Sequence, residues 1–149
     1  MKVLLDLNVV LDVVLNRQPW VEESQRVWDA NQSQTIDGYL VATGLTNLFY
    51  IVRRLADRDR ARSAVRTCLA SFEIIAVDHQ TLRDADGQAG ADFEDNVCIA
   101  CAVSAGMAAI VTRNPADFAH SLIPVLTPAE LLNRLATAGP AAPQPTTGS

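Results

Sequence analysis

The stretch Val3-Leu4-Leu5-Asp6 places a carboxylate directly after a short apolar run. A run of this length is typical of a buried strand in a parallel sheet. Residues 8–16 follow with helical spacing, so the chain passes from strand to helix at the aspartate. Because parallel α/β sheets bind ligands outside the carboxyl ends of their strands, Asp6 is the first candidate site residue.

The same alternation of apolar strands and helices continues along the chain. Further strands are predicted at residues 35–41, 73–77, 108–112 and 124–126. Further helices are predicted at residues 20–32, 43–56, 58–71, 93–105, in a short turn at 115–118, and from residue 128. Asp78 is placed to cap the helix after it, and Thr127 and Glu130 form a capping-box pattern. The sequence therefore predicts an α/β fold with three layers, α/β/α, around a central parallel sheet of about five strands.

The chain has 149 residues, of which 49% are hydrophobic. This is enough for one domain that buries its own core. We expect the domain to span residues 1–138, and the uncharged, proline-rich residues 139–149 to form a disordered tail. No apolar run has the length of a membrane span and no signal-peptide pattern is present, so we expect a cytoplasmic protein.

The chain has three cysteines, an odd number that fits a reducing compartment. Redox cysteine pairs stand at a helix N-terminus, whereas Cys98 and Cys101 lie further inside a predicted helix. A zinc site would need a second pair of ligands, for which only Cys68, His79 and His120 remain. We therefore expect the cysteines to pack in the core.

Two more aspartates stand where the predicted sheet delivers residues to the same edge. Asp95 lies at the start of an apolar helix, and Asp117 follows the strand predicted at residues 108–112. Each could simply be a negative charge at a helix N-terminus, where the helix dipole stabilises it. Together with Asp6, however, they would repel one another, and buried charge costs several kcal/mol unless a cation compensates it. Mg²⁺ or Mn²⁺, which prefer oxygen ligands, are the natural partners.

The net charge of −5 disfavours a protein that only coats nucleic acid. It does not exclude an enzyme that acts on phosphates, because a bound metal supplies local positive charge. Six arginines crowd residues 53–66, diluted only by Asp57 and Asp59. This stretch is either a solvated helical hairpin with internal ion pairs, a basic rim beside the acidic site, or a surface for an acidic partner.

Three segments resemble motifs of the PIN-domain ribonucleases, and they occur in the order that the family has them. These are residues 4–12, 92–100 and 111–118. One such motif alone is weak, but three in order with fitting flanking elements are specific. The resemblance covers residues 1 to about 136. It implies a Mg²⁺- or Mn²⁺-dependent endoribonuclease with a PIN-like fold, of the VapC-like kind that serves as toxin in bacterial toxin–antitoxin pairs.

The resemblance also implies roles for individual residues. Asp6, Asp95 and Asp117 would hold the divalent ion, and Asp92 would join them if it shares a helical face with Asp95. The family usually has a glutamate where Asn47 stands, on the helix after the second strand. We therefore expect Asn47 to assist catalysis in a site that binds metal more weakly than one with four carboxylates.

The fourth motif departs from the usual Thr-Arg-Asp, since here it reads Thr112-Arg113-Asn114. Asp117, three residues on, can restore the lost carboxylate, and this pair of departures resembles a recognisable branch of PIN-like proteins. The residues that would support the site are Asn8, Thr112, through its hydroxyl, and Asn114. The residues that would contact RNA are Arg53, Arg54 and Arg113.

Partners and the remaining polar and aromatic residues complete the expectations. The resemblance implies a homodimer and a protein antitoxin that fills the cleft. Asp12 is expected to face solvent or to pair with an arginine. Trp20, Trp28 and Tyr50 fit core or dimer packing better than base stacking, and His79 is expected on the surface at a helix start.

Two alternative functions are weighed against the nuclease. With Asn47 in place of a carboxylate, a PIN-like fold can be a catalytically weak module that binds RNA or protein. An aspartyl-phosphate phosphatase or receiver domain would use Asp6 as nucleophile. Those families also need a lysine near the phosphate, and the single lysine, Lys2, precedes the first strand. The phosphatases need a second aspartate where Asn8 stands.

Overall fold

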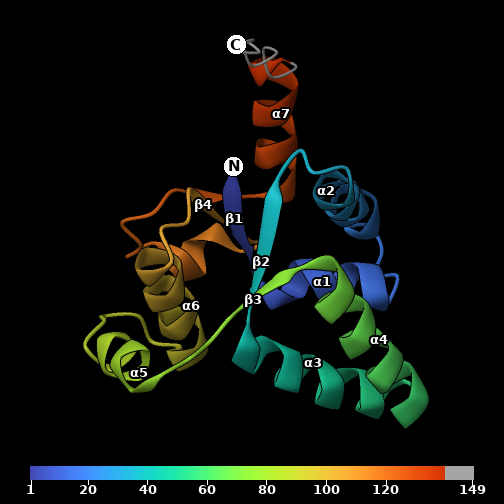
Figure 1. Ribbon diagram of the computed structural model, residues 1–149, viewed down its shortest axis with the longest axis horizontal. Coiled ribbons are helices and arrows are strands. Elements are labelled where there is room, and N and C mark those ends of the chain that lie inside the picture. The colour runs from blue at the N-terminus through green and yellow to red at the C-terminus, as the bar shows by residue number, and fades with distance from the viewer. Residues whose placement is uncertain (140–149) are drawn as a thin grey trace, which may run out of the picture.

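The computed structural model describes residues 1–139, so the predicted tail, apart from Gly139, lies outside the described residues. Within them, five parallel strands form one sheet in the order β3-β2-β1-β4-β5. The strands are β1 (Lys2–Leu5), β2 (Asp37–Val41), β3 (Glu73–Ile75), β4 (Ala109–Val111) and β5 (Val125–Leu126). Helices cover both faces of the sheet (Figure 1), which confirms the predicted three-layer α/β/α fold.

The connections between the strands are helical, as predicted. They contain α1 (Leu7–Val14), α2 (Val21–Gln32), α3 (Ala42–Leu55), α4 (Arg58–Ser71), α5 (His79–Asp86), α6 (Phe93–Ser104) and the 3₁₀ helix η1 (Pro115–Phe118), and α7 (Pro128–Ala138) follows the last strand. The predicted ends differ by one or two residues. Among the strands, β2 begins two residues later than predicted, and β3 ends two residues earlier because its pairing with β2 stops where Val41 meets Ile75.

The alternation of side chains along β1 divides the core into two clusters. Val3 and Leu5 lie in a cluster with buried residues of α1, α2, α3, α4 and α7. Leu4 lies in the other cluster, with residues of α5 and α6. Successive strand residues point to opposite faces, so Val3, Leu4 and Leu5 are buried on both sides of the sheet and hold Asp6, which follows them, in place.

Side-chain caps fix the starts of two helices, as predicted. The Asp78 carboxylate accepts the Thr81 backbone N–H at 2.9 Å. Thr127 and Glu130 form a complete capping box at the start of α7. Such caps satisfy backbone donors that the first helical turn leaves free.

The three cysteines are free thiols. Cys68 and Cys101 are buried, and burial raises the pKa of each to about 11, so neither is a thiolate near neutral pH. Core packing is thus confirmed for these two. Cys98 is only half-buried and lies against the cleft described below, because it is on the first turns of α6.

No helix in the described part of the chain has both the length and the apolar character that a membrane span requires.

Candidate active site

The site begins at the carboxyl ends of the two central strands, β1 and β4. The backbone N–H of Asp6 donates to the Val111 carbonyl at 2.8 Å, which continues the pairing of the two strands. Thr112, fully buried, then donates its hydroxyl hydrogen to Oδ2 of Asp6 at 2.8 Å. The pairing of β1 with β4 therefore holds the Asp6 carboxylate in one orientation.

The Thr112 hydroxyl is also the centre of the supporting contacts, which join it to Asp6, Asn8 and Asn114. Its oxygen accepts from the Asn114 backbone N–H at 3.1 Å and from Nδ2 of Asn8 at 3.4 Å. The Asn8 carbonyl oxygen in turn accepts from the Arg113 backbone N–H at 3.4 Å. The first turn of α1 and the loop after β4 are thus joined at Asp6.

Asp95 and Asp92 reach the same edge from the start of α6. Asp92 is the N-cap residue, with extended backbone, and its carboxylate accepts the Asp95 backbone N–H at 3.2 Å. The condition set for Asp92, that it share a helical face with Asp95, is not met, because Asp92 lies just outside the helix. Its role in this structure is to cap α6 and to place a negative charge beside Asp95.

The carboxylates act on one another electrostatically. Burial raises the pKa of Asp95 to about 7, and the charges of Asp92, Asp6, Asp117 and Glu94 add to the rise. Burial also raises the pKa of Asp6, to which Asp117 adds, while the Thr112 hydrogen bond opposes it. Within residues 1–139, none of these carboxylates forms an ion pair with an Arg, Lys or His side chain. Their repulsion is therefore left without an ion pair from the described chain, and the charge of Arg113 lowers the pKa of Asp6 only as the weakest of the effects upon it.

The side chains at this edge of the sheet are candidates to hold a divalent ion. In the described residues, no three His, Cys, Asp or Glu side chains converge closely enough to hold a metal. The predicted cluster of three or four carboxylates is thus not formed as a ready metal site, although the charges of Asp6, Asp92 and Asp117 all act on Asp95. Mg²⁺, however, keeps several waters and needs only one or two protein carboxylates. Asp6 and Asp95, oxygen donors with raised pKa, fit such a hydrated ion.

A small cleft opens between α3 and α6, beside Asp6 and Asp95. It encloses about 50 Å³, which holds a few waters but not a nucleotide. Asn47 of α3 donates its amide hydrogen to the Glu94 carboxylate across the opening. The other lining residues are Leu5, Leu7, Leu40, Val41, Thr43, Gly44, Leu45 and Cys98.

Glu94 was not among the predicted site residues. It lines the cleft, bonds Asn47 and adds to the rise in the pKa of Asp95. Its place inside the third motif, directly before Asp95, was the one signal in the sequence that could have identified it.

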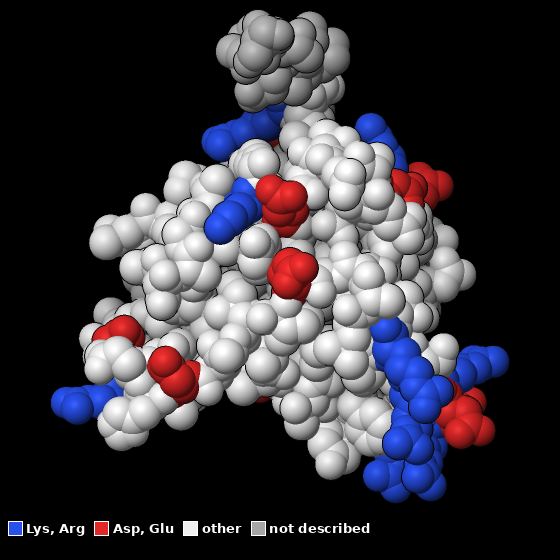
Figure 2. All heavy atoms as spheres, viewed as in Figure 1, with Lys and Arg blue, Asp and Glu red and all other residues white. Residues whose placement is uncertain are grey.

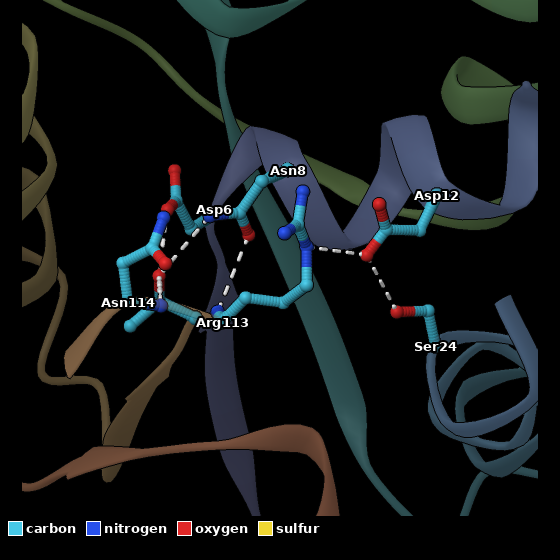
Figure 3. A network of polar contacts seen from close by, with 7 residues as sticks. Asp6, Asn8, Asp12, Ser24, Arg113 and Asn114 are labelled. Carbon is cyan, nitrogen blue, oxygen red and sulfur yellow. Dashed lines mark hydrogen bonds and ion pairs between the residues drawn. The ribbon is translucent and has the colours of Figure 1, made fainter. Parts of the chain in front are cut away.

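Arg113 is not placed to contact RNA. Its Nε lies 2.7 Å from Oδ2 of the fully buried Asp12, and its guanidinium lies 4.1 Å over the Trp20 ring (Figure 3 shows the ion pair). Ser24 donates to the same carboxylate oxygen at 3.2 Å. The predicted RNA contact is therefore corrected, since α1, α2 and Trp20 together occupy this arginine. Of the two alternatives predicted for Asp12, pairing with an arginine is confirmed and exposure to solvent is wrong.

The remaining predicted residues lie away from the carboxylates. Arg53 and Arg54 are exposed in the last turn of α3. His79 is exposed at the start of α5, as expected. His120 lies 3.0 Å from the side-chain oxygen of Asn96. Neither histidine is among the groups that shift the pKa of Asp6 or Asp95.

Comparison with known proteins agrees with this architecture. The family model of the PIN domain matches residues 2–116. The chain belongs to the PIN domain family. The comparison with curated proteins found no match.

Several solved structures share the PIN fold of this chain. DNA-bound VapBC from Salmonella typhimurium is 20% identical with a TM-score of 0.67, over 86% of this chain and 98% of that chain. A toxin–antitoxin complex from Klebsiella pneumoniae is 19% identical with a TM-score of 0.64, over 85% of this chain and 97% of that chain. The sarcin-ricin loop cleaving toxin VapC20 of Mycobacterium tuberculosis is 12% identical with a TM-score of 0.61, over 72% of this chain and 86% of that chain. At these identities the likeness concerns the fold.

Proposed function

We propose that this PIN-domain protein is a metal-dependent endoribonuclease that cuts RNA phosphodiester bonds. The observation that carries the proposal is the set of carboxylates at the edge of β1 and β4, which raise one another's pKa and form no ion pair within residues 1–139. Like charges held this close repel one another, and the repulsion is relieved by a proton or by a bound cation. A divalent cation relieves it for several carboxylates at once.

Asp6 and Asp95 would hold Mg²⁺ or Mn²⁺, with Asp117 and Asp92 adding negative charge around it. When bound, the ion would activate a water and stabilise the departing oxygen of the phosphodiester. Thr112 keeps the Asp6 carboxylate in position through its hydrogen bond. The apolar cleft wall lowers the local dielectric and strengthens every charge interaction at the site.

The cellular role that we propose is that of toxin in a toxin–antitoxin pair. The support is the family and the fold shared with the toxin–antitoxin complexes from Salmonella typhimurium and Klebsiella pneumoniae. A protein antitoxin and a homodimer belong to this proposal. The carboxylates at the cleft are a surface that a basic side chain of an antitoxin can occupy.

A second candidate is a PIN-like module that binds RNA or protein without cutting. The observation that favours it is the hydrogen bond from Asn47 to Glu94, which ties one carboxylate of the cleft to a neutral amide. If this is the function, Asn47 offers no carboxylate to a metal, and Glu94 is held by the Asn47 amide.

Cleavage of structured and unstructured RNA with Mg²⁺ or Mn²⁺ separates the two functions. We expect wild type to cut, and both EDTA and Asp95→Asn to lower the rate by more than about 100-fold. Asp29→Asn, an exposed aspartate on α2, is the matched control and should cut as wild type does. If folded wild type shows no metal-dependent cleavage, the binding module is the better function. Cleavage that survives Asp95→Asn removes Asp95 from the site.

A further inference from the structure

Positive charge is concentrated in one hairpin of the molecule. Residues 42–71, which form α3 and α4, contain six arginines and two aspartates, a net charge of +4. Since the whole chain carries −5, the remainder carries −9. Figure 2 shows Lys and Arg side chains gathered at the end of the molecule where α3 and α4 meet in Figure 1.

Most of this charge is not neutralised within the hairpin. All six arginines are exposed, and in residues 1–139 only Arg60 forms an ion pair, with Asp57 at 3.6 Å. The sequence alternative of a hairpin held by internal ion pairs is thus wrong for the other five. Arg60 lies in one groove, beside Leu55 and Ala56, whereas Arg62 and Arg66 of α4 line a different hollow.

Aromatic side chains lie among the unpaired arginines. Phe49 shares one hollow with Arg62 and Arg66, and Tyr50 shares the neighbouring one with Arg53 and Arg54. The two rings meet edge to face, with centroids 5.2 Å apart, so the hollows form one surface. We call these six residues the arginine face. Tyr50 is 59% exposed, which excludes the core packing predicted for it.

The arginine face continues from the cleft along α3. Asn47, Tyr50 and Arg54 are three and four residues apart, so they lie on one side of the helix. From Asn47 to Arg54 the helix rises about 10 Å. Because the cleft is too small for a nucleotide, a strand with a phosphate at its opening must lie across the surface.

We propose that the arginine face binds the single-stranded RNA that flanks the phosphate at the cleft. The arginines neutralise the backbone, and Tyr50 stacks on an unpaired base, which a duplex does not offer. The proposal rests on the proposed function, since it places the substrate of that site. An acidic protein segment would pair with the arginines, but it has no base that could stack on Tyr50. It would also give no reason for the arginine face to lie in line with Asn47.

The test is binding of a fluorescent single-stranded RNA in EDTA, followed by anisotropy over a range of salt concentrations. Arg54→Gln/Arg62→Gln/Arg66→Gln should weaken binding at least tenfold and lower the slope of log K against log salt by about 2. The matched control removes three exposed arginines elsewhere, Arg26, Arg83 and Arg134, and should retain most of the affinity and slope. Tyr50→Leu should weaken binding about tenfold with an unchanged slope.

Each outcome decides the proposal. Equal losses in the arginine-face and control variants overturn it, as does wild type that binds polyglutamate but not RNA. If circular dichroism shows the triple variant unfolded, single Arg54→Gln and Tyr50→Leu replace it. RNA binding with the expected slope but no cleavage upholds the arginine face and refutes the nuclease. Cleavage of long RNA that is unchanged in the triple variant does the reverse.

Discussion

The carboxylates at the two ends of α1 meet opposite electrostatic conditions. Burial raises the pKa of both the fully buried Asp12 and the half-buried Asp6. Asp12 has Arg113 at 2.7 Å, whereas Asp6 forms no ion pair within residues 1–139 and has Asp117 and Asp95 near it. The charge of Arg113 also lowers the pKa of Asp6, but less than any other group named with it. The comparison teaches that the missing ion pair, and not burial, distinguishes the proposed metal site from Asp12.

The largest effect on stability is expected when Asp12 loses its ion pair with Arg113. Arg113→Met leaves a buried carboxylate without its ion pair, so we expect a loss of about 3–5 kcal/mol in the free energy of unfolding. Urea denaturation measures it. Asp12→Asn combined with Arg113→Met should recover a large part of the loss.

The control for this change is Arg83→Met, an exposed arginine on α5, which should stay within about 0.5 kcal/mol of wild type. If Arg113→Met is as mild as that control, Arg113 does not compensate Asp12, and the contrast between the two groups has no energetic basis.

A smaller effect is expected when Asp6 loses the hydrogen bond from the Thr112 hydroxyl. Thr112→Val keeps the shape of a fully buried side chain but removes the hydrogen bond to Oδ2. Hydrogen bonds to charged groups contribute about 2 kcal/mol, and we expect a loss of that size at pH 8. Thermal unfolding measures it, with the exposed Thr46→Val as control. A neutral Thr112→Val would show that the hydroxyl does not stabilise the ionised acid.

The pH dependence of stability sharpens the contrast further. Asp95 has a pKa of about 7 in the folded protein against 3.8 ordinarily, so the folded state binds its proton more tightly. In EDTA, wild type should therefore lose stability relative to Asp95→Asn as the pH rises from 3.8 to about 7. Because Asp95 is partly exposed, the difference should be only about 1 kcal/mol. Denaturation at several pH values measures it.

Mg²⁺ supplies the control for that experiment. It should remove the difference above pH 7 by stabilising wild type and not Asp95→Asn. A difference that grows in the opposite direction with pH, or one that Mg²⁺ leaves unchanged, contradicts the idea that this group lacks a cation.

The smallest expected effect concerns Asn47. Asn47→Glu places a carboxylate against Glu94, so in EDTA we expect a loss of about 0.5 kcal/mol from like-charge repulsion. Glu94→Gln in the same chain should restore it, and a double-mutant cycle measures the coupling. No coupling would mean that the two side chains do not meet in solution.

Local signals predicted most of the fold and much of the site. The apolar run before Asp6, the capping patterns at Asp78 and Thr127, and the carboxyl edge of the sheet all depend on residues close in sequence. The pair of Asp12 and Arg113 could not be predicted, because it joins positions 101 residues apart and depends on how α1 packs beside the loop after β4. The arginine face could not be predicted for a similar reason. The sequence shows its arginines, but only the structure shows that they form no ion pair within residues 1–139.

The hydrogen bond between Asp6 and Thr112 spans 106 positions of the sequence. Within this domain β1 is made before the other strands, yet it lies between β2 and β4, and β4 follows only after most of the domain. While the domain is being made, Asp6 is therefore present long before the strand that holds it in place. The order of strands in the sheet thus delays assembly of the acid group until most of the domain has been made.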